Sequence, residues 1–179
     1  VTDVPAKPAF NMSCGIGLYS KYVVGTGAVA DKDPVVQGSC TWTHTSGIYV
    51  EPWFSQSLRD PGRGTTYGNE LDLTVGYGGK LGSWSYDVHF GYYDVTNPKL
   101  LQVNGDVINP GATLRYHVSE TTNVFANTEY YVGIGSRGFA GGWRNGIGVA
   151  GGVGPFATEG ALYHNTFLGN GKFLRLGTI

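Results

Sequence analysis

Residues 83–94 read SWSYDVHFGYYD, and large apolar side chains alternate there with small or polar ones. Every second position holds an aromatic or aliphatic residue, namely Trp84, Tyr86, Val88, Phe90 and Tyr92. Successive side chains of a β-strand point to opposite faces, so this period of two indicates a strand with one apolar and one polar face. The run therefore predicts a sheet whose two faces have different surroundings.

The same alternation recurs along most of the chain. It is clear in residues 11–18, 70–77, 108–119 and 124–132. By this criterion the chain contains about ten strands. They are predicted near residues 10–24, 36–45, 47–57, 68–78, 82–95, 107–118, 121–133, 142–151, 158–167 and 171–178.

The predicted connections alternate between long and short. Long ones cover 25–35, 59–67, 96–106 and a glycine-rich 135–141, whereas short ones cover 45–46, 79–81 and 119–120. An up-and-down barrel with this pattern has all its long loops at one end, as outer-membrane barrels do. The predicted fold is an all-β, antiparallel, up-and-down transmembrane β-barrel of about ten strands, with eight or twelve as alternatives. Residues 1–179 form one domain, in which 1–9 is a periplasmic extension.

The composition narrows the function classes. Lys and Arg number 12 and Asp and Glu number 13, which gives a formal net charge of −1 and argues against nucleic acid as a partner. Charged residues are 14% of the chain, below the roughly 25% of ordinary soluble domains. No apolar run approaches the roughly 20 residues of a spanning helix, whereas a barrel strand needs only about 9–11. The opening VTDVP is read as a mature start after a removed leader.

The two cysteines, Cys14 and Cys40, do not have a metal-ligand spacing such as C-x-x-C. A disulfide between them would fit an oxidising periplasm. The alternative is a pair of small buried or lipid-facing thiols. The sequence predicts no metal site and no cofactor.

A soluble β-sandwich would show the same alternation, with its apolar face packed and its polar face in water. Aromatic residues lie on the apolar face near strand ends, which suits the interfacial girdles of a membrane barrel and suits a sandwich core nearly as well. They are Trp42, Phe54, Tyr77, Trp84, Tyr92, Tyr116, Tyr130 and Trp143. The alternating lengths of the connections favour the barrel.

Ionisable residues of both signs fall on the polar face, which a barrel turns toward its lumen. One interpretation is a charged eyelet that selects solutes. The favoured one is a network of salt bridges and hydrogen bonds that fills a narrow lumen. In either case Arg115, Arg144 or Lys21 is expected to meet acidic residues of neighbouring strands, namely Glu51, Asp72 and Asp87. The predicted inner network consists of Glu51, Asp72, Asp87, His89, Arg115, His117, Glu129 and Arg144.

Asp87 and His89 share a face two residues apart, with Ser85 nearby, and an Asp–His pair could act as a general base. Proximity in sequence shows no triad geometry, so no enzyme is predicted. Glycines at 146, 148, 151 and 152 indicate close backbone packing or tight curvature of the sheet. Alternatively, they form a flat outer surface for protein partners or self-association.

Short motifs follow one another through the first half of the chain. They read YSKY, PVVQG, HTSGIY and ELDLTVGY at residues 19–22, 34–38, 44–49 and 70–77, followed by paired aromatic and acidic residues at 86–93. In order and spacing they resemble the TorF-like porins, a bacterial outer-membrane family formerly described as conserved and of unknown function. The resemblance implies an outer-membrane location and a pore role, and it implies no catalytic residues.

The leading prediction is therefore an outer-membrane β-barrel that conducts small solutes through a narrow polar lumen and contacts outer-membrane lipid. A second hypothesis is a structural or assembly subunit of an outer-membrane complex with no transport role. A third is a soluble secreted β-sandwich that binds carbohydrate through exposed aromatic residues.

Overall fold

The protein is a single meander of β-strands. The computed structural model describes residues 9–24, 29–59, 70–95, 104–137, 141–153, 156–166 and 171–178, and these contain no helix. The predicted extension 1–9 thus lies, except for Ala9, outside the described residues. Ten strands form one sheet in the order β1-β4-β5-β6-β7-β8-β9-β10-β11-β12. Their bounds are Phe10–Tyr19, Val35–His44, Ile48–Ser57, Glu70–Leu81, Trp84–Val95, Asn104–His117, Thr122–Arg137, Gly142–Val153, Phe156–Asn165 and Gly171–Thr178.

Every neighbouring pair in this sheet is antiparallel. The predicted all-β, antiparallel, up-and-down arrangement is confirmed. No described segment is a helix with the length and apolar character needed to cross a membrane. The predicted strand 10–24 is divided, because the chain leaves the sheet after Tyr19 and forms a small hairpin of β2 (Tyr22–Val23) and β3 (Val29–Asp31).

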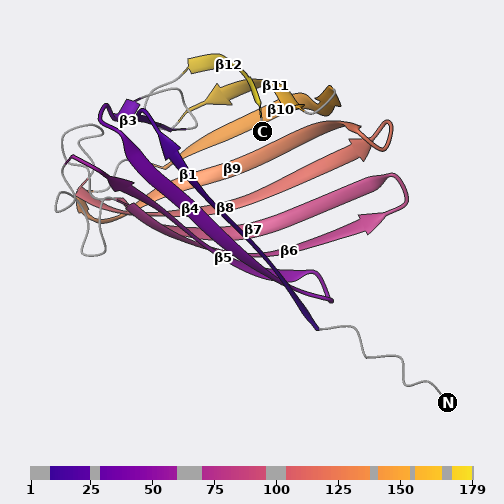
Figure 1. Ribbon diagram of the computed structural model, residues 1–179, viewed down its shortest axis with the longest axis horizontal. Coiled ribbons are helices and arrows are strands. Elements are labelled where there is room, and N and C mark those ends of the chain that lie inside the picture. The colour runs from indigo at the N-terminus through magenta and orange to yellow at the C-terminus, as the bar shows by residue number, and fades with distance from the viewer. Residues whose placement is uncertain are drawn as a thin grey trace.

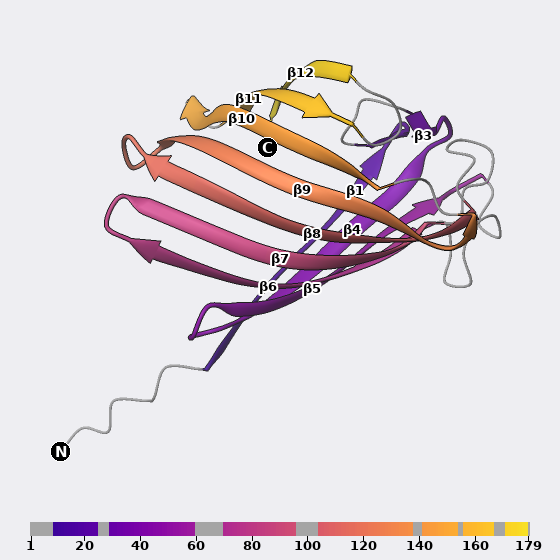
Figure 2. The ribbon, with the colours of Figure 1, turned by 180° about the vertical axis from the view of Figure 1, so that it is seen from behind.

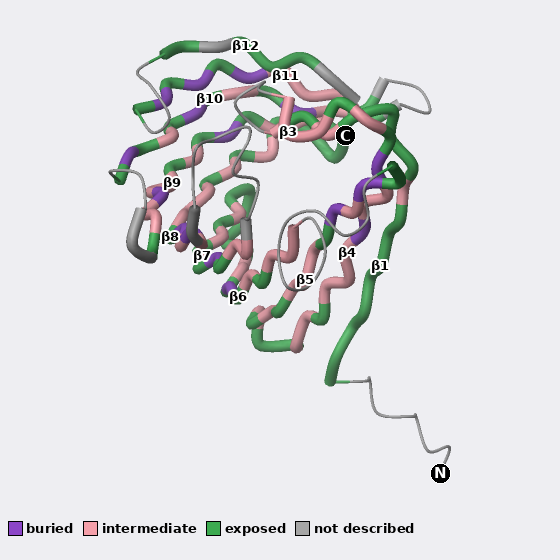
Figure 3. The backbone as a smooth tube through the Cα atoms, turned by 90° about the vertical axis from the view of Figure 1, so that its left-hand side faces the viewer, coloured by how far each residue is buried: buried purple, intermediate pink, exposed green. Residues whose placement is uncertain are grey.

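The sheet curls strongly. Figure 3 shows its strands following one another around a common axis, from β1 through β5 and β6 to β10, β11 and β12. β1 and β12 are the two edges, and no pairing joins them among the described residues. The turns that link β4 to β5, β6 to β7 and β8 to β9 lie together at one end, and β3 lies at the other (Figures 1 and 2). We call the concave side of the curl the inner face and the convex side the outer face.

The turn predicted at residues 79–81 is wrong, because β6 continues to Leu81 and the chain reverses at Gly82 and Ser83. Gly82 has a φ of 59°, a left-handed conformation that glycine adopts without strain. Gly79 stays in the strand, where the ring of Tyr86 from β7 lies over it. A Cβ at residue 79 would come 2.5 Å from the Tyr86 hydroxyl, so this glycine serves packing and not chain reversal.

The apolar side chains lie mainly on the outer face and are exposed. Val75 and Phe90, at the middle of β6 and β7, have 45% and 50% of their surface accessible. Buried apolar residues among those described are few: Val35, Val107, Phe125, Tyr131, Ala150, Ala161 and Tyr163. Polar Asn109 and Ser55, by contrast, are 0% and 2% exposed. This distribution is the reverse of a soluble domain, where large apolar side chains form the interior.

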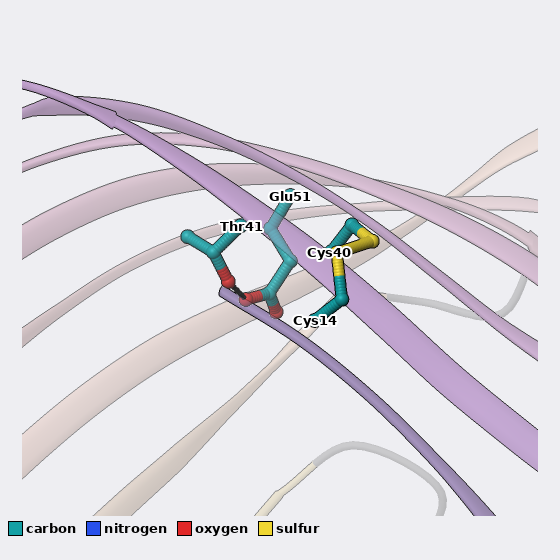
Figure 4. The surroundings of a disulfide bond; sticks show 4 residues. All are labelled: Cys14, Cys40, Thr41 and Glu51. Carbon is teal, nitrogen blue, oxygen red and sulfur yellow. Dashed lines mark hydrogen bonds between the residues drawn. A yellow bond between two sulfur atoms is a disulfide. The ribbon is translucent and has the colours of Figure 1, made fainter. Parts of the chain in front are cut away.

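Cys14 and Cys40 form a disulfide that joins the edge strand β1 to β4 (Figure 4). They are direct partners in the antiparallel register, with their Cα atoms 4.1 Å apart. Ile16 and Trp42, two residues further along each strand, share their face, and both are exposed. The disulfide therefore lies on the apolar outer face and fastens a strand that, within the described part of the chain, pairs on one side alone.

A Cys14→Ser/Cys40→Ser variant is expected to lose about 2–4 kcal/mol of unfolding free energy, because the closed loop no longer limits the unfolded chain. The two residues are 26 positions apart. Denaturant titration in detergent would measure the change. Reducing agent should lower the midpoint of the wild type and leave that of the variant unchanged. Equal midpoints for oxidised and reduced wild type would contradict a stabilising role.

Candidate functional site

The predicted network residues all occupy inner-face positions, and none of them is fully exposed. They come from six adjacent strands of the curled sheet, β5 to β10. They lie on the inner face because each is an odd number of positions from the exposed apolar residues of its strand, and successive side chains of a strand point to opposite faces. They do not form one cluster. Three of them line a cavity and two form an arginine–glutamate pair, and the other three, Asp72, Arg115 and His117, lie apart from both groups.

A cavity of about 440 Å³ opens on the inner face of β4 to β7. Three predicted residues line it, Glu51, Asp87 and His89. The Thr41 hydroxyl donates a hydrogen bond to Glu51, as Figure 4 shows. His89 Nδ1 lies 2.8 Å from Asp87 Oδ1. The remaining lining residues are hydroxyl-bearing: Thr41, Thr43, Tyr49, Thr74 and Tyr93.

Glycines make room for the rings that line this cavity. A Cβ at Gly76 would overlap the ring of Tyr49, and one at Gly111 would overlap the imidazole of His89. In each case the glycine and the ring belong to residues paired across two strands. These glycines let bulky side chains lie flat against the wall, so that the space in front of the wall stays open.

Arg144 of β10 forms an ion pair with Glu129 of β9, its direct register partner, at 2.5 Å. The Tyr131 hydroxyl also donates to Glu129, at 2.7 Å. The guanidinium lies over the rings of Tyr131 and Tyr163, 5.4 and 5.7 Å from their centroids. Both side chains of the pair are mostly withdrawn from solvent, with exposures of 18% and 12%. Arg144 is thus paired with Glu129 and not with one of the three acidic residues that were expected to meet it.

Arg115 stacks on Phe125, 4.9 Å from the ring centroid, and donates to the Asn123 side chain at 3.3 Å. Its charge also acts on the nearby Asp87. Lys21, the third cation expected to join the network, is exposed outside the sheet.

The possible catalytic residues fall into two separate pairs. Ser85 Oγ lies 2.9 Å from Nε2 of His117, whereas Asp87 is bonded to His89. Among the described residues no hydrogen bond links the serine to the Asp87–His89 pair. Nor do the described residues include three or more metal-ligating side chains grouped to hold an ion.

Asp72 lies toward the end of the sheet that carries the β2–β3 hairpin. Its buried Oδ1 has no hydrogen-bond partner among the described residues. The hairpin places Tyr22 against Trp53, with ring centroids 5.7 Å apart, and beside Glu70. Burial and the neighbouring carboxylates raise the pKa of the Tyr22 hydroxyl, so the hydroxyl remains protonated and donates to Glu70.

Two of the glycines considered for an outer docking surface lie on the inner face. Gly146 leaves room for the ring of Tyr163, and Gly148 leaves room for Phe125. A Cβ at Gly148 would come 2.6 Å from the Phe125 ring and 2.6 Å from the backbone oxygen of Gly160. For these two positions the docking interpretation is wrong, because close internal packing requires them.

Aromatic residues that lie on the inner face were not among the residues predicted from the sequence. Tyr49, Tyr93, Phe125, Tyr131 and Tyr163 all point inward among polar groups. Their positions in the alternation could have predicted this, because Tyr49 lies two residues from Glu51 and Tyr131 lies two residues from Glu129, and residues two apart in a strand share a face.

A family model described as a bacterial protein of unknown function (Gcw_chp) matches residues 3–139, which contain all the strands from β1 to β9. No curated protein and no solved structure matches the chain. The match covers well over half of the 179 residues. The chain therefore belongs to the Gcw_chp family of bacterial proteins.

Proposed function

We propose that this protein is a transmembrane β-barrel of the bacterial outer membrane and that it serves as a narrow channel for small solutes. The observation that carries the proposal is the exposed apolar outer face opposite a polar inner face. A lipid environment makes that arrangement stable, because hydrocarbon replaces the missing protein interior. The same exposure argues against a soluble sandwich, whose apolar face would be packed.

Aromatic residues at both ends of the outer face support the membrane proposal. Trp84 and Tyr116 pack together near the short turns, with ring centroids 4.9 Å apart. Tyr130 and Trp143 pack at 4.8 Å toward the opposite end of their strands. Aromatic rings are favoured at the two membrane–water interfaces, and outer-membrane barrels carry such rings in two girdles.

Closure of the curled sheet is part of the proposal. The sheet has ten strands, so its first and last strands run antiparallel and can pair in the same manner as the others. Unpaired backbone groups at two open edges would each cost several kcal/mol in hydrocarbon. Hydrogen exchange in detergent tests this point. Protection of the β1 amides that point away from β4 is expected, and rapid exchange there would contradict closure.

Expression with a secretory leader tests the proposed location and activity. The protein is expected in the outer-membrane fraction, with heat-modifiable migration in detergent and discrete single-channel currents in planar bilayers. Folding into the membrane without conductance would favour a structural subunit. A soluble monomer without detergent would overturn the membrane proposal, and carbohydrate binding would then be tested.

Gly76→Ala is expected to lower single-channel conductance while the barrel still folds. The added Cβ displaces the Tyr49 ring, and the displaced atoms are at the far end of a flexible side chain, so the ring can swing into the cavity. Bilayer recording measures the change. Gly76→Ala/Tyr49→Ala is the matched control and should recover the conductance. Unchanged conductance in Gly76→Ala would show that this cavity does not limit the current.

A further inference from the structure

Seven of the eight residues that line the inner-face cavity carry a side-chain oxygen. Among its lining residues, Glu51 and Asp87 are acidic, His89 is the one basic side chain, and neither Lys nor Arg contributes. Carboxylate and hydroxyl oxygens are the groups that replace part of the hydration shell of a small hard cation. An anion in the same place would face carboxylates without a guanidinium to bind it.

Described arginines on the inner face are engaged elsewhere. Arg144 forms its ion pair with Glu129, and Arg175 lies 3.9 Å from Glu159. Arg115 is stacked on Phe125, donates a hydrogen bond to Asn123 and is not among the residues that line the cavity. Each of these three guanidinium groups therefore has its partners outside the cavity lining.

Acidic side chains continue along the β5 and β6 wall. Glu51 receives a hydrogen bond from Thr41 and has no basic partner among the described residues. Further along the same wall, Glu70 is bonded to Tyr22, and Asp72 has an unpartnered buried oxygen. A solute moving along this wall meets carboxyl oxygens from the cavity to the end that carries the hairpin.

We infer that this cavity is the ion-selecting segment of the proposed channel and that it admits small cations in preference to anions. The inference rests on the proposed channel function. Glu51 is its principal selectivity residue, because its carboxylate faces the open space without a balancing cation among the described side chains.

The test is the reversal potential of the intact protein in planar bilayers across a potassium chloride gradient. The wild type should favour potassium over chloride. Glu51→Gln should lower this permeability ratio by roughly 25-fold, because one unit charge about 4 Å from the ion in a water-filled passage changes the potassium and chloride permeabilities about fivefold each and in opposite directions. Glu51→Asp should keep most of the preference. Glu120→Gln, in an exposed turn between β8 and β9, is the matched control and should not alter the ratio.

The outcomes separate this inference from the channel proposal. Heat-modifiable migration first establishes that each variant is folded. Measurable currents with a chloride preference, or a ratio that Glu51→Gln leaves unchanged, would overturn cation selection at this cavity and leave the channel standing. Absence of current from folded wild-type protein would overturn the channel and the inference with it.

Discussion

Val75→Arg is expected to remove about 2–4 kcal/mol of folding free energy in a lipid bilayer, the cost of a cation near the midplane of a barrel's lipid face. Val75 lies at the middle of β6 and pairs with Val50 of β5 and Phe90 of β7, all three of which are exposed. A proposed transmembrane barrel places this apolar row in the hydrocarbon. Folding into vesicles under denaturant, followed by heat-modifiable migration, measures the loss.

Leu81→Arg is the matched control for this prediction. Leu81 has the same parity as Val75 and is the last residue of the same strand, next to the short turn, where 76% of its surface is exposed. A cation near the interface costs only about 0–1 kcal/mol. A large cost at residue 75 and a small one at residue 81 would locate the bilayer along β6. Equal, small effects at both positions would contradict burial of the outer face in lipid.

Arg144→Met is expected to destabilise the folded protein by about 3–5 kcal/mol, because it leaves the Glu129 carboxylate buried without its partner. The pair is 2.5 Å apart and largely shielded from water. The Tyr131 hydroxyl can satisfy one carboxylate oxygen but cannot balance its charge. Denaturant midpoints in detergent or vesicles would measure the change.

A second substitution distinguishes an uncompensated charge from lost packing. In the Arg144→Met/Glu129→Gln variant the neutral amide can still accept from Tyr131, so most of the lost stability should return. If the double variant is as unstable as Arg144→Met alone, the contribution of Arg144 comes from its stacking on Tyr131 and Tyr163 and not from its charge.

The strands and their two faces were predictable because alternation is a property of the extended backbone itself. Each sheet strand overlaps a predicted segment, including the glycine-rich β10. Turn positions were harder, since consecutive glycines at 78 and 79 resemble a turn while Gly79 in fact accommodates the Tyr86 ring. Only the partner strand reveals that a glycine is covered by a ring.

The inner-face residues were predictable as a set, and their partners were not. Parity within one strand places Arg144 and Glu129 on the same side of the sheet. Their direct pairing depends on the register between β9 and β10. The segment that connects these strands and the curvature of the whole sheet determine this register. For the same reason the sequence could not indicate that Arg115 stacks on Phe125 or that Ser85 contacts His117.

The bond between Cys14 and Cys40 also bears on the order of events during biogenesis. It links the first two strands of the sheet, and it needs no residue beyond them to bring the thiols together. In an oxidising compartment the disulfide can join β1 to β4 while the rest of the chain is still unstructured. Under the proposed membrane fold, β1 would then enter the bilayer already paired with β4. Its other edge would remain available to pair with β12, the last strand.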